Sequence, residues 1–188
     1  MIKNIGLCPN HARMYSAKQG FKVNVSFQEG YNAIISPNAK GKSIILQAIA
    51  NCSSCNVQKT PRTKIKYFTQ EKLNPALKRK NLGIKEMTLS SRANFSSHGE
   101  TVLDVLRNSK YNGENCFLFD YPESGLDFEN VEKMRKRFAH LGERDLQTII
   151  ATHNPLFLKE ANIIELEKGY LKKLIKQYSE VLDILKHR

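Results

Sequence analysis

The sequence predicts an α/β fold with a largely parallel central sheet flanked by helices. Short apolar segments with the length of buried strands recur along the chain, and segments with the helical spacing of apolar residues lie between them. This alternation is typical of parallel sheets, because each helix returns the chain to the same end of the sheet. The 188 residues contain no internal repeat and no linker, so we expect one domain over residues 1–188.

The first half of the chain is expected to contain three strands and a helix. Residues 21–27 alternate apolar and polar side chains like a half-buried strand, and residues 31–35 follow a turn as a more buried strand. The sequence then predicts a helix over 41–50 and a short strand over 65–68. Residues 73–94 have little periodicity, which favours a loop, with one helix within it as the alternative.

The second half continues the alternation of helices and strands. Val131, Met134, Phe138 and Leu141 fall on one face of a predicted helix. The other expected elements are a helix over 101–108, buried strands over 116–119, 147–151 and 163–166, and an amphipathic helix from Leu171 to Leu185.

The chain is strongly basic, with 30 Lys and Arg residues against 18 Asp and Glu residues and a formal net charge of +12. Residues 59–80 carry eight of these bases and one acid. This charge favours polyanionic partners, so the segment is a candidate for DNA or RNA contact; the alternative is a solvated face beside a bound triphosphate. No apolar segment approaches the ~18 residues of a membrane span, and no signal-peptide core begins the chain. We therefore expect a cytoplasmic protein without a membrane partner.

The four cysteines of the chain are expected to be thiols or metal ligands. Cys8 and His11 are spaced like half of a zinc site, and so are Cys52 and Cys55. A structural Zn²⁺ site follows only if the fold brings both halves together. Otherwise Cys52 simply ends the helix that begins near residue 41.

The segment between the strand at 31–35 and the helix at 41–50 has the composition of a phosphate-binding loop. Backbone N–H groups at a helix N-terminus bind phosphate, and a glycine before the lysine lets the backbone approach it. The lysine neutralises the β- and γ-phosphates, and the next hydroxyl ligates Mg²⁺. The first position, usually glycine, is serine here, and a plain turn before a helix is the alternative interpretation. The loop residues are Ser36, Pro37, Asn38, Ala39, Lys40, Gly41, Lys42 and Ser43.

Two later strands end in polar residues. The apolar segment 116–119 is followed by Asp120, and the segment 147–151 is followed by Thr152 and His153. An acid at the carboxyl end of a strand beside the phosphate loop is placed to contact Mg²⁺. A lone histidine is more often structural, but this one follows a phosphate loop and an acidic strand in order.

Taken in order, the motifs resemble those of ATP-binding-cassette ATPases, which are P-loop NTPases. More narrowly, the chain is similar to small non-transporter ATPases related to the recombination-repair and chromosome-maintenance ATPases. The resemblance covers roughly residues 21–170. The segments that carry it are 37–43, 67–75, 96–100, 119–127 and 151–155.

The resemblance implies a role for individual residues at the nucleotide. Gly41, Lys42 and Ser43 would bind phosphate and Mg²⁺, and Asp120 matches the acidic end of the Walker B strand. His153 matches the switch histidine that contacts the γ-phosphate. Gln70 lies where the family's glutamine senses Mg²⁺ and the attacking water, although Glu71 makes that alignment ambiguous.

The resemblance also implies a head-to-tail homodimer that encloses two ATP molecules. Ser97 and Gly99 match the signature motif, which contacts the nucleotide of the opposite subunit, and Asp127 matches the loop that crosses the dimer interface. Only 25 residues separate Gln70 from Ser96. The helical subdomain that couples transporters to the membrane is therefore expected to be reduced.

Departures from the family pattern bear on catalysis. Tyr121 stands where the family has the catalytic glutamate, and His98 replaces a signature glycine. A phenol with a pKa near 10 is a poor base at neutral pH. Glu123 is the candidate base instead, and it shares a face with Tyr121 if the backbone stays extended through Pro122.

Three functions remain open from the sequence. The first is a slow ATPase with bound Mg²⁺ that acts as a nucleotide-driven dimer, possibly on DNA. The second is a switch that binds ATP and recruits a partner with negligible hydrolysis, which Tyr121 favours. The third is a zinc-stabilised nucleic-acid-binding module whose nucleotide site is degenerate.

Overall fold

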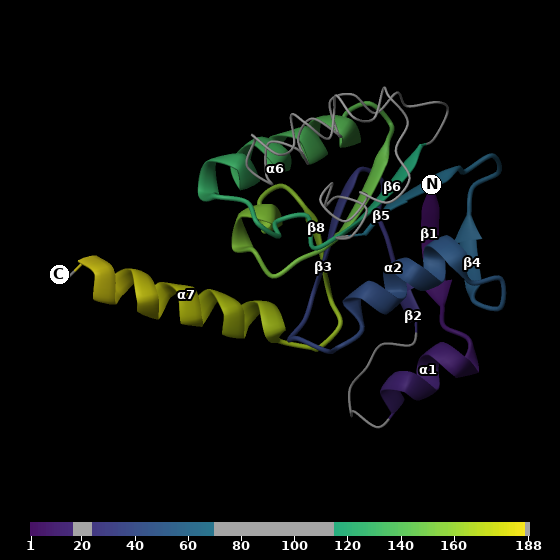
Figure 1. Cartoon of the computed structure of the whole chain (residues 1–188), viewed down its shortest axis with the longest axis horizontal. Helices are drawn as coiled ribbons and strands as arrows, with labels where there is room; N and C mark the ends of the chain where they lie inside the picture. Colours follow the sequence, from purple (N-terminus) through teal and green to yellow (C-terminus); the bar gives the residue numbers. More distant parts are fainter. Residues whose placement is uncertain (17–23, 70–114, 187–188) are drawn as a thin grey trace, which may run out of the picture.

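The structure is a computed structural model that describes residues 1–16, 24–69 and 115–186 (Figure 1). Its centre is a five-stranded sheet in the order β5-β6-β7-β3-β8, in which all neighbouring strands are parallel. The strands are β3 (Tyr31–Ile35), β5 (Ile65–Phe68), β6 (Cys116–Asp120), β7 (Gln147–Ala151) and β8 (Asn162–Glu165). The predicted α/β fold with a parallel sheet is confirmed.

In the described part of the chain, one helix lies on each face of this sheet, as Figure 1 shows. Helix α2 (Lys42–Asn51) packs on one face, where Leu118 joins its core, and helix α6 (Phe128–Gly142) packs on the other, where Phe117 and Phe119 join its core. Side chains that alternate along β6 therefore enter opposite cores, and every residue of β6 is buried. This double burial explains why the strand reads as a continuous apolar run.

A second, antiparallel sheet lies beside the first and has the order β2-β1-β4. Its strands are β1 (Ile2–Gly6), β2 (Asn24–Ser26) and β4 (Asn56–Lys59), and helix α1 (Pro9–Ser16) follows β1. The Gln147 side chain joins the two sheets, since its Oε1 accepts from the Ile2 N–H at 2.6 Å and its Nε2 donates to the Ile2 carbonyl at 2.8 Å. The sequence did not predict β1, α1 or β4. Of the strand expected over 21–27, residues 24–26 are described as β2.

The C-terminal helix α7 (Tyr170–Lys186) extends away from the sheet (Figure 1). A 3₁₀ helix, Pro155–Leu158, precedes β8. The amphipathic pattern predicted for α7 is present, but among its apolar side chains Leu174 is buried and Ile175, Tyr178, Val181, Leu182, Ile184 and Leu185 are exposed. Within the described ranges, no helix has both the length and the apolar character needed to cross a bilayer.

Several predictions fall outside the described residues. They are the loop over 73–94, the helix over 101–108, and the candidate site residues Gln70, Ser97 and Gly99.

Candidate functional site

The candidate site lies where three neighbouring parallel strands end. β3 leads into the loop of residues 36–41, β6 ends at Asp120, and β7 is followed by Thr152 and His153. Because the carboxyl ends of parallel strands share one edge of the sheet, these segments meet there. Helix α2 begins at the same edge and directs its N-terminal N–H groups and the positive end of its dipole into the site.

The loop before α2 has backbone conformations that few residue types adopt easily. Gly41, the residue before the helix, has a φ of 90°, and Ala39 has a φ of 57°. Glycine tolerates the first conformation without steric cost, whereas alanine adopts the second with strain. Asn38 and Ala39 are exposed, and Lys40 forms an ion pair with Glu167 at 3.1 Å.

Lys42 lies inside this loop and is 2% exposed. Its Nζ donates to the Ser36 carbonyl at 2.8 Å, to the Pro37 carbonyl at 3.1 Å and to the Ser36 hydroxyl at 3.3 Å. Burial lowers the pKa of Lys42 from 10.5 to about 8, against the opposing attraction of the carboxylates of Glu123 and Asp120. All three of these hydrogen bonds are to neutral oxygens.

Ser43 and Asp120 form a second polar pair beside Lys42. The Ser43 hydroxyl donates to Oδ1 of Asp120 at 2.9 Å, and the Tyr67 hydroxyl donates to Oδ2 at 3.4 Å. Burial raises the pKa of Asp120, and both hydroxyl donors oppose the rise. A hydroxyl and a carboxylate in contact at a phosphate loop are the oxygen ligands that Mg²⁺ uses. Tyr67 was not predicted as a site residue.

Glu123 is held by the segment after β7. Its Oε1 accepts from the Thr152 hydroxyl at 2.8 Å and from the His153 N–H at 2.9 Å. Its Oε2 is buried and has no hydrogen-bond partner among the described residues. Burial raises the pKa of this carboxyl group, and the hydrogen bonds to Oε1 oppose the rise. The sequence reasoning named Thr152 only as part of a polar pair and missed that it holds Glu123.

Tyr121 does not extend the strand. It has a φ of 50°, and its carbonyl accepts from the Ser124 N–H at 3.1 Å, so the chain turns directly after Asp120. The condition under which Glu123 would share a face with Tyr121, an extended backbone through Pro122, is therefore not met. The chain turns here because a residue with a left-handed backbone conformation cannot continue a strand.

The Tyr121 side chain pairs with His153. Its hydroxyl lies 3.2 Å from Nε2 of His153, and the two rings stack with centroids 5.2 Å apart. Burial raises the pKa of Tyr121 to about 12 and lowers the pKa of His153. At neutral pH the pair is thus a protonated phenol beside a neutral imidazole. The ammonium of Lys42 lies 5.6 Å from the centre of the Tyr121 ring.

Asp127 lies on the surface and caps helix α6. Its Oδ1 accepts from the Asn130 N–H at 2.8 Å. The next residue, Phe128, is 72% exposed.

The structure also brings together the two half-sites of cysteine and histidine. The ligand atoms of Cys8, His11, Cys52 and Cys55 all lie within 4.8 Å of one another, a grouping that could hold a metal ion. This cluster is at the opposite end of α2 from the phosphate loop, because Cys52 caps the C-terminus of that helix.

No family model and no curated protein matches the chain, but solved structures do. CbiO1 from Clostridium perfringens, part of the ABC transporter complex CbiONQ, has a TM-score of 0.56 at 17% identity over 80% of this chain and 79% of that chain. The ATP-binding cassette MJ0796, solved as a dimer in a post-hydrolysis state with ADP and Pi, has a TM-score of 0.52 at 19% identity. A further dimeric structure of MJ0796, a bacterial ABC transporter cassette, has a TM-score of 0.54 at 20% identity. Both cover 78% of this chain and 85% of their own.

These neighbours agree with the parallel five-stranded sheet and its two helical layers. The chain therefore has the fold of an ATP-binding-cassette ATPase domain.

Proposed function

We propose that this chain binds Mg²⁺–ATP at the loop of residues 36–43 and hydrolyses it slowly as a head-to-tail homodimer. The observation that carries the proposal is the meeting of a buried lysine, a paired hydroxyl and carboxylate, and a helix N-terminus at one sheet edge. A buried cation whose hydrogen bonds within the described residues go to neutral oxygens favours an anionic ligand, because the anion would offset the cost of desolvating the charge.

Phosphate binding would use the contacts of Lys42. Its three acceptors come from Ser36 and Pro37, and the oxygens of the β- and γ-phosphates would replace them with stronger, charge-assisted partners. Ser43 would exchange its bond with Asp120 for ligation of Mg²⁺, and Asp120 would orient the ion's shell. ATP supplies the phosphoryl group that water attacks.

Glu123 is the base in this proposal. Its Oε1 is fixed by two donors while its buried Oε2 is unpartnered within the described part of the chain, and a raised pKa makes a carboxylate a better proton acceptor. Tyr121, with a pKa of about 12, holds a proton and cannot accept one at neutral pH. Its contact with Nε2 would instead position His153 toward the γ-phosphate.

Dimerisation is proposed from the surface beside α6 and from the neighbours. Asp127 and the largely exposed Phe128 lie next to each other on the surface, and MJ0796 is dimeric in both of its structures. Ser97 and Gly99, outside the described residues, would reach the nucleotide of the partner copy.

A second candidate is a switch that binds ATP without turnover. Tyr121 favours it, because a stacked tyrosine–histidine pair fills the position where the resembled family carries a catalytic carboxylate. In this case ATP would close the dimer and recruit a partner.

The basic segment supports a polyanionic partner. Lys59, Arg62 and Lys64 are exposed in its described part, and a cluster of exposed bases binds the phosphate backbone of nucleic acids. We extend the proposal to DNA contact through this segment, in keeping with the resemblance to recombination-repair ATPases.

The test is ATP turnover by purified protein, with and without double-stranded DNA, using Lys42→Ala as the contamination control. Turnover that disappears in Lys42→Ala supports the ATPase, and stimulation by DNA that fades at high salt supports the DNA contact. ATP binding without turnover supports the switch. Turnover equal in both proteins would contradict a role for this loop.

A further inference from the structure

Four cysteine and histidine side chains, types that can bind a metal ion, lie close together where two segments that link elements of the fold meet. Cys8 and His11 lie at the junction of β1 and α1, and Cys52 and Cys55 lie between α2 and β4. The two pairs are about forty residues apart in sequence. Pairing of β1 with β4, in which Gly6 lies opposite Asn56, brings them side by side.

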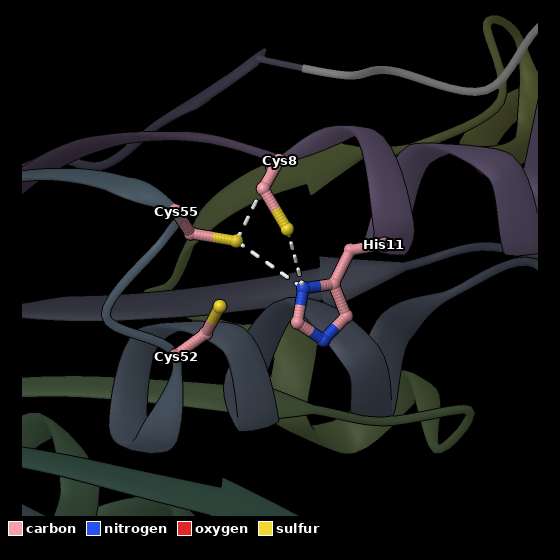
Figure 2. Close-up of side chains that lie close together, drawn as sticks. All are labelled: Cys8, His11, Cys52 and Cys55. Atoms are coloured by element: carbon pink, nitrogen blue, oxygen red, sulfur yellow. Dashed lines mark hydrogen bonds between the residues drawn. The ribbon is translucent and has the colours of Figure 1, made fainter.

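The side chains point toward one centre, as Figure 2 shows. Nδ1 of His11 lies 3.2 Å from the Cys8 sulfur and 3.3 Å from the Cys55 sulfur, and the Cys52 sulfur completes the group within 4.8 Å. In a tetrahedral zinc site the ligand atoms are about 3.5–3.8 Å apart, since Zn–S is about 2.3 Å and Zn–N about 2.0 Å. The closest pairs would therefore move slightly apart, and the widest pairs slightly together, to admit the ion.

The surroundings enclose two of the sulfur atoms and supply a hydrogen-bond donor to one of them. Cys8 and Cys55 are each 7% exposed, and the Cys8 backbone N–H donates to the Cys55 sulfur at 3.3 Å. Such a donor compensates negative charge on a metal-bound thiolate. Cys116 is also buried, but it lies in β6 outside the cluster.

We infer that Cys8, His11, Cys52 and Cys55 bind one structural Zn²⁺ ion. Three thiolates and one imidazole are the soft ligands that zinc prefers in tetrahedral sites. The four protein ligands leave no position open for water or substrate, so the ion stabilises and does not catalyse. This site is independent of the proposed ATPase activity and stands whether or not ATP is hydrolysed.

The ion would fasten the antiparallel sheet to the phosphate-loop helix. Cys52 caps α2, so a metal bond there fixes the end of the helix whose start holds Lys42. The apolar core around α2 already includes Ile2, Ile5 and Val25 of the antiparallel sheet. The zinc ligands would extend this contact to the junction of β1 and α1, where Cys8 and His11 lie.

The main test is the metal content of the tag-free wild-type protein, purified without chelator and measured by inductively coupled plasma mass spectrometry. About one zinc per chain is expected, as for a single four-ligand site. Removal of the metal with a zinc chelator should lower Tm by about 5–10 °C, because metal binding is coupled to folding.

Variants locate the ion. Cys8→Ser and Cys55→Ser should lose zinc, whereas Cys116→Ser, the matched control, should keep it. His11→Cys should also keep zinc, because four thiolates form an equally good site; after cobalt exchange its thiolate charge-transfer absorption should exceed that of the wild type. These spectra remain informative even if the serine variants fold poorly.

Three outcomes would overturn the inference. They are wild-type protein without zinc, zinc retained in both Cys8→Ser and Cys55→Ser, or a disulfide within the cluster found by alkylation and mass spectrometry. Loss of ATP binding alone would count against the proposed function and would leave the metal site intact.

Discussion

Helix α2 joins two polar sites that differ in what they do to the stability of the protein. At its N-terminal end, Lys42 is buried against neutral acceptors, and its lowered pKa means that the charge disfavours folding. At its C-terminal end, four soft ligands converge on one centre, where a metal ion would favour folding. Lys42 hydrogen-bonds to neutral oxygens and could exchange them for a ligand, whereas the four side chains of the cluster would enclose a bound ion.

The largest expected effect is on ATP turnover and comes from Glu123, which belongs to the site at the N-terminal end of α2. Glu123→Gln keeps the acceptor for Thr152 and His153 but removes the carboxylate, so the fold should persist. ATP turnover should fall by about 10²–10⁴-fold, which is the usual contribution of a general base. Steady-state kinetics measure this.

The matched control for that variant is Glu143→Gln, an exposed carboxylate beyond the end of α6. Turnover in Glu123→Gln equal to that of the control would exclude Glu123 as the base and would favour another group or the switch.

The charge on Lys42 gives a pH dependence of stability. The folded-state pKa of about 8 lies below the ordinary 10.5, so between these values the unfolded chain binds more protons than the native one, and wild-type stability rises with pH. Relative to Lys42→Met, the nucleotide-free wild type should gain about 2 kcal/mol between pH 7 and pH 10. Urea unfolding at both pH values measures the difference.

The control for this prediction is the variant Lys136→Met, which replaces an exposed lysine. The free energy of unfolding of this variant should change with pH as that of the wild type does. A flat difference between wild type and Lys42→Met across the same range would show that the buried charge carries no cost.

Substitutions of Tyr121 test whether a phenol at this position slows ATP hydrolysis. Tyr121→Glu should raise turnover about 10-fold, because a carboxylate would replace a phenol whose pKa is about 12. Tyr121→Phe keeps the ring but removes the hydroxyl that contacts His153 and Ser43, and it serves as the comparison. No gain in Tyr121→Glu would mean that Glu123 already suffices or that another step limits the rate.

The smallest effect is expected at Asp127, which caps α6. Asp127→Ala should cost about 1 kcal/mol, the usual value of an N-cap, and lower Tm by about 2–4 °C. Asp127→Asn keeps the cap and should leave Tm unchanged. If Asp127→Asn nevertheless weakens an ATP-dependent dimer, the residue acts at the interface as well.

The inner strands β3, β6 and β7 of the central sheet were predictable because every one of their residues is buried. The predicted ranges 31–35 and 147–151 coincide with β3 and β7, and the range 65–68 coincides with β5, although most of β5 is only half-buried. Strands β1 and β4 were not predicted. Segments such as Asn56–Lys59 contain few apolar residues and form strands because they pair with a segment distant in sequence.

The sequence predicted which residues form the site, but it did not predict the hydrogen bonds between them. Lys42, Ser43 and Asp120 follow from the order of loop and strands, whereas the bond from Tyr67 depends on which strand neighbours β6. The turn at Tyr121 was unpredictable from composition, because a tyrosine seldom takes a positive φ. The Cys/His cluster was visible as two halves, and only the pairing of β1 with β4 joins them.

The most direct test of the account is a calorimetric titration of the wild-type protein and Lys42→Ala with Mg²⁺–ATP, on samples of equal zinc content. The account predicts saturable binding of about one ATP per chain in the wild type and a loss of at least about 100-fold in affinity in Lys42→Ala, as expected when a buried charge loses its partner. Equal affinity in the two proteins, or no binding in the wild type, would contradict it.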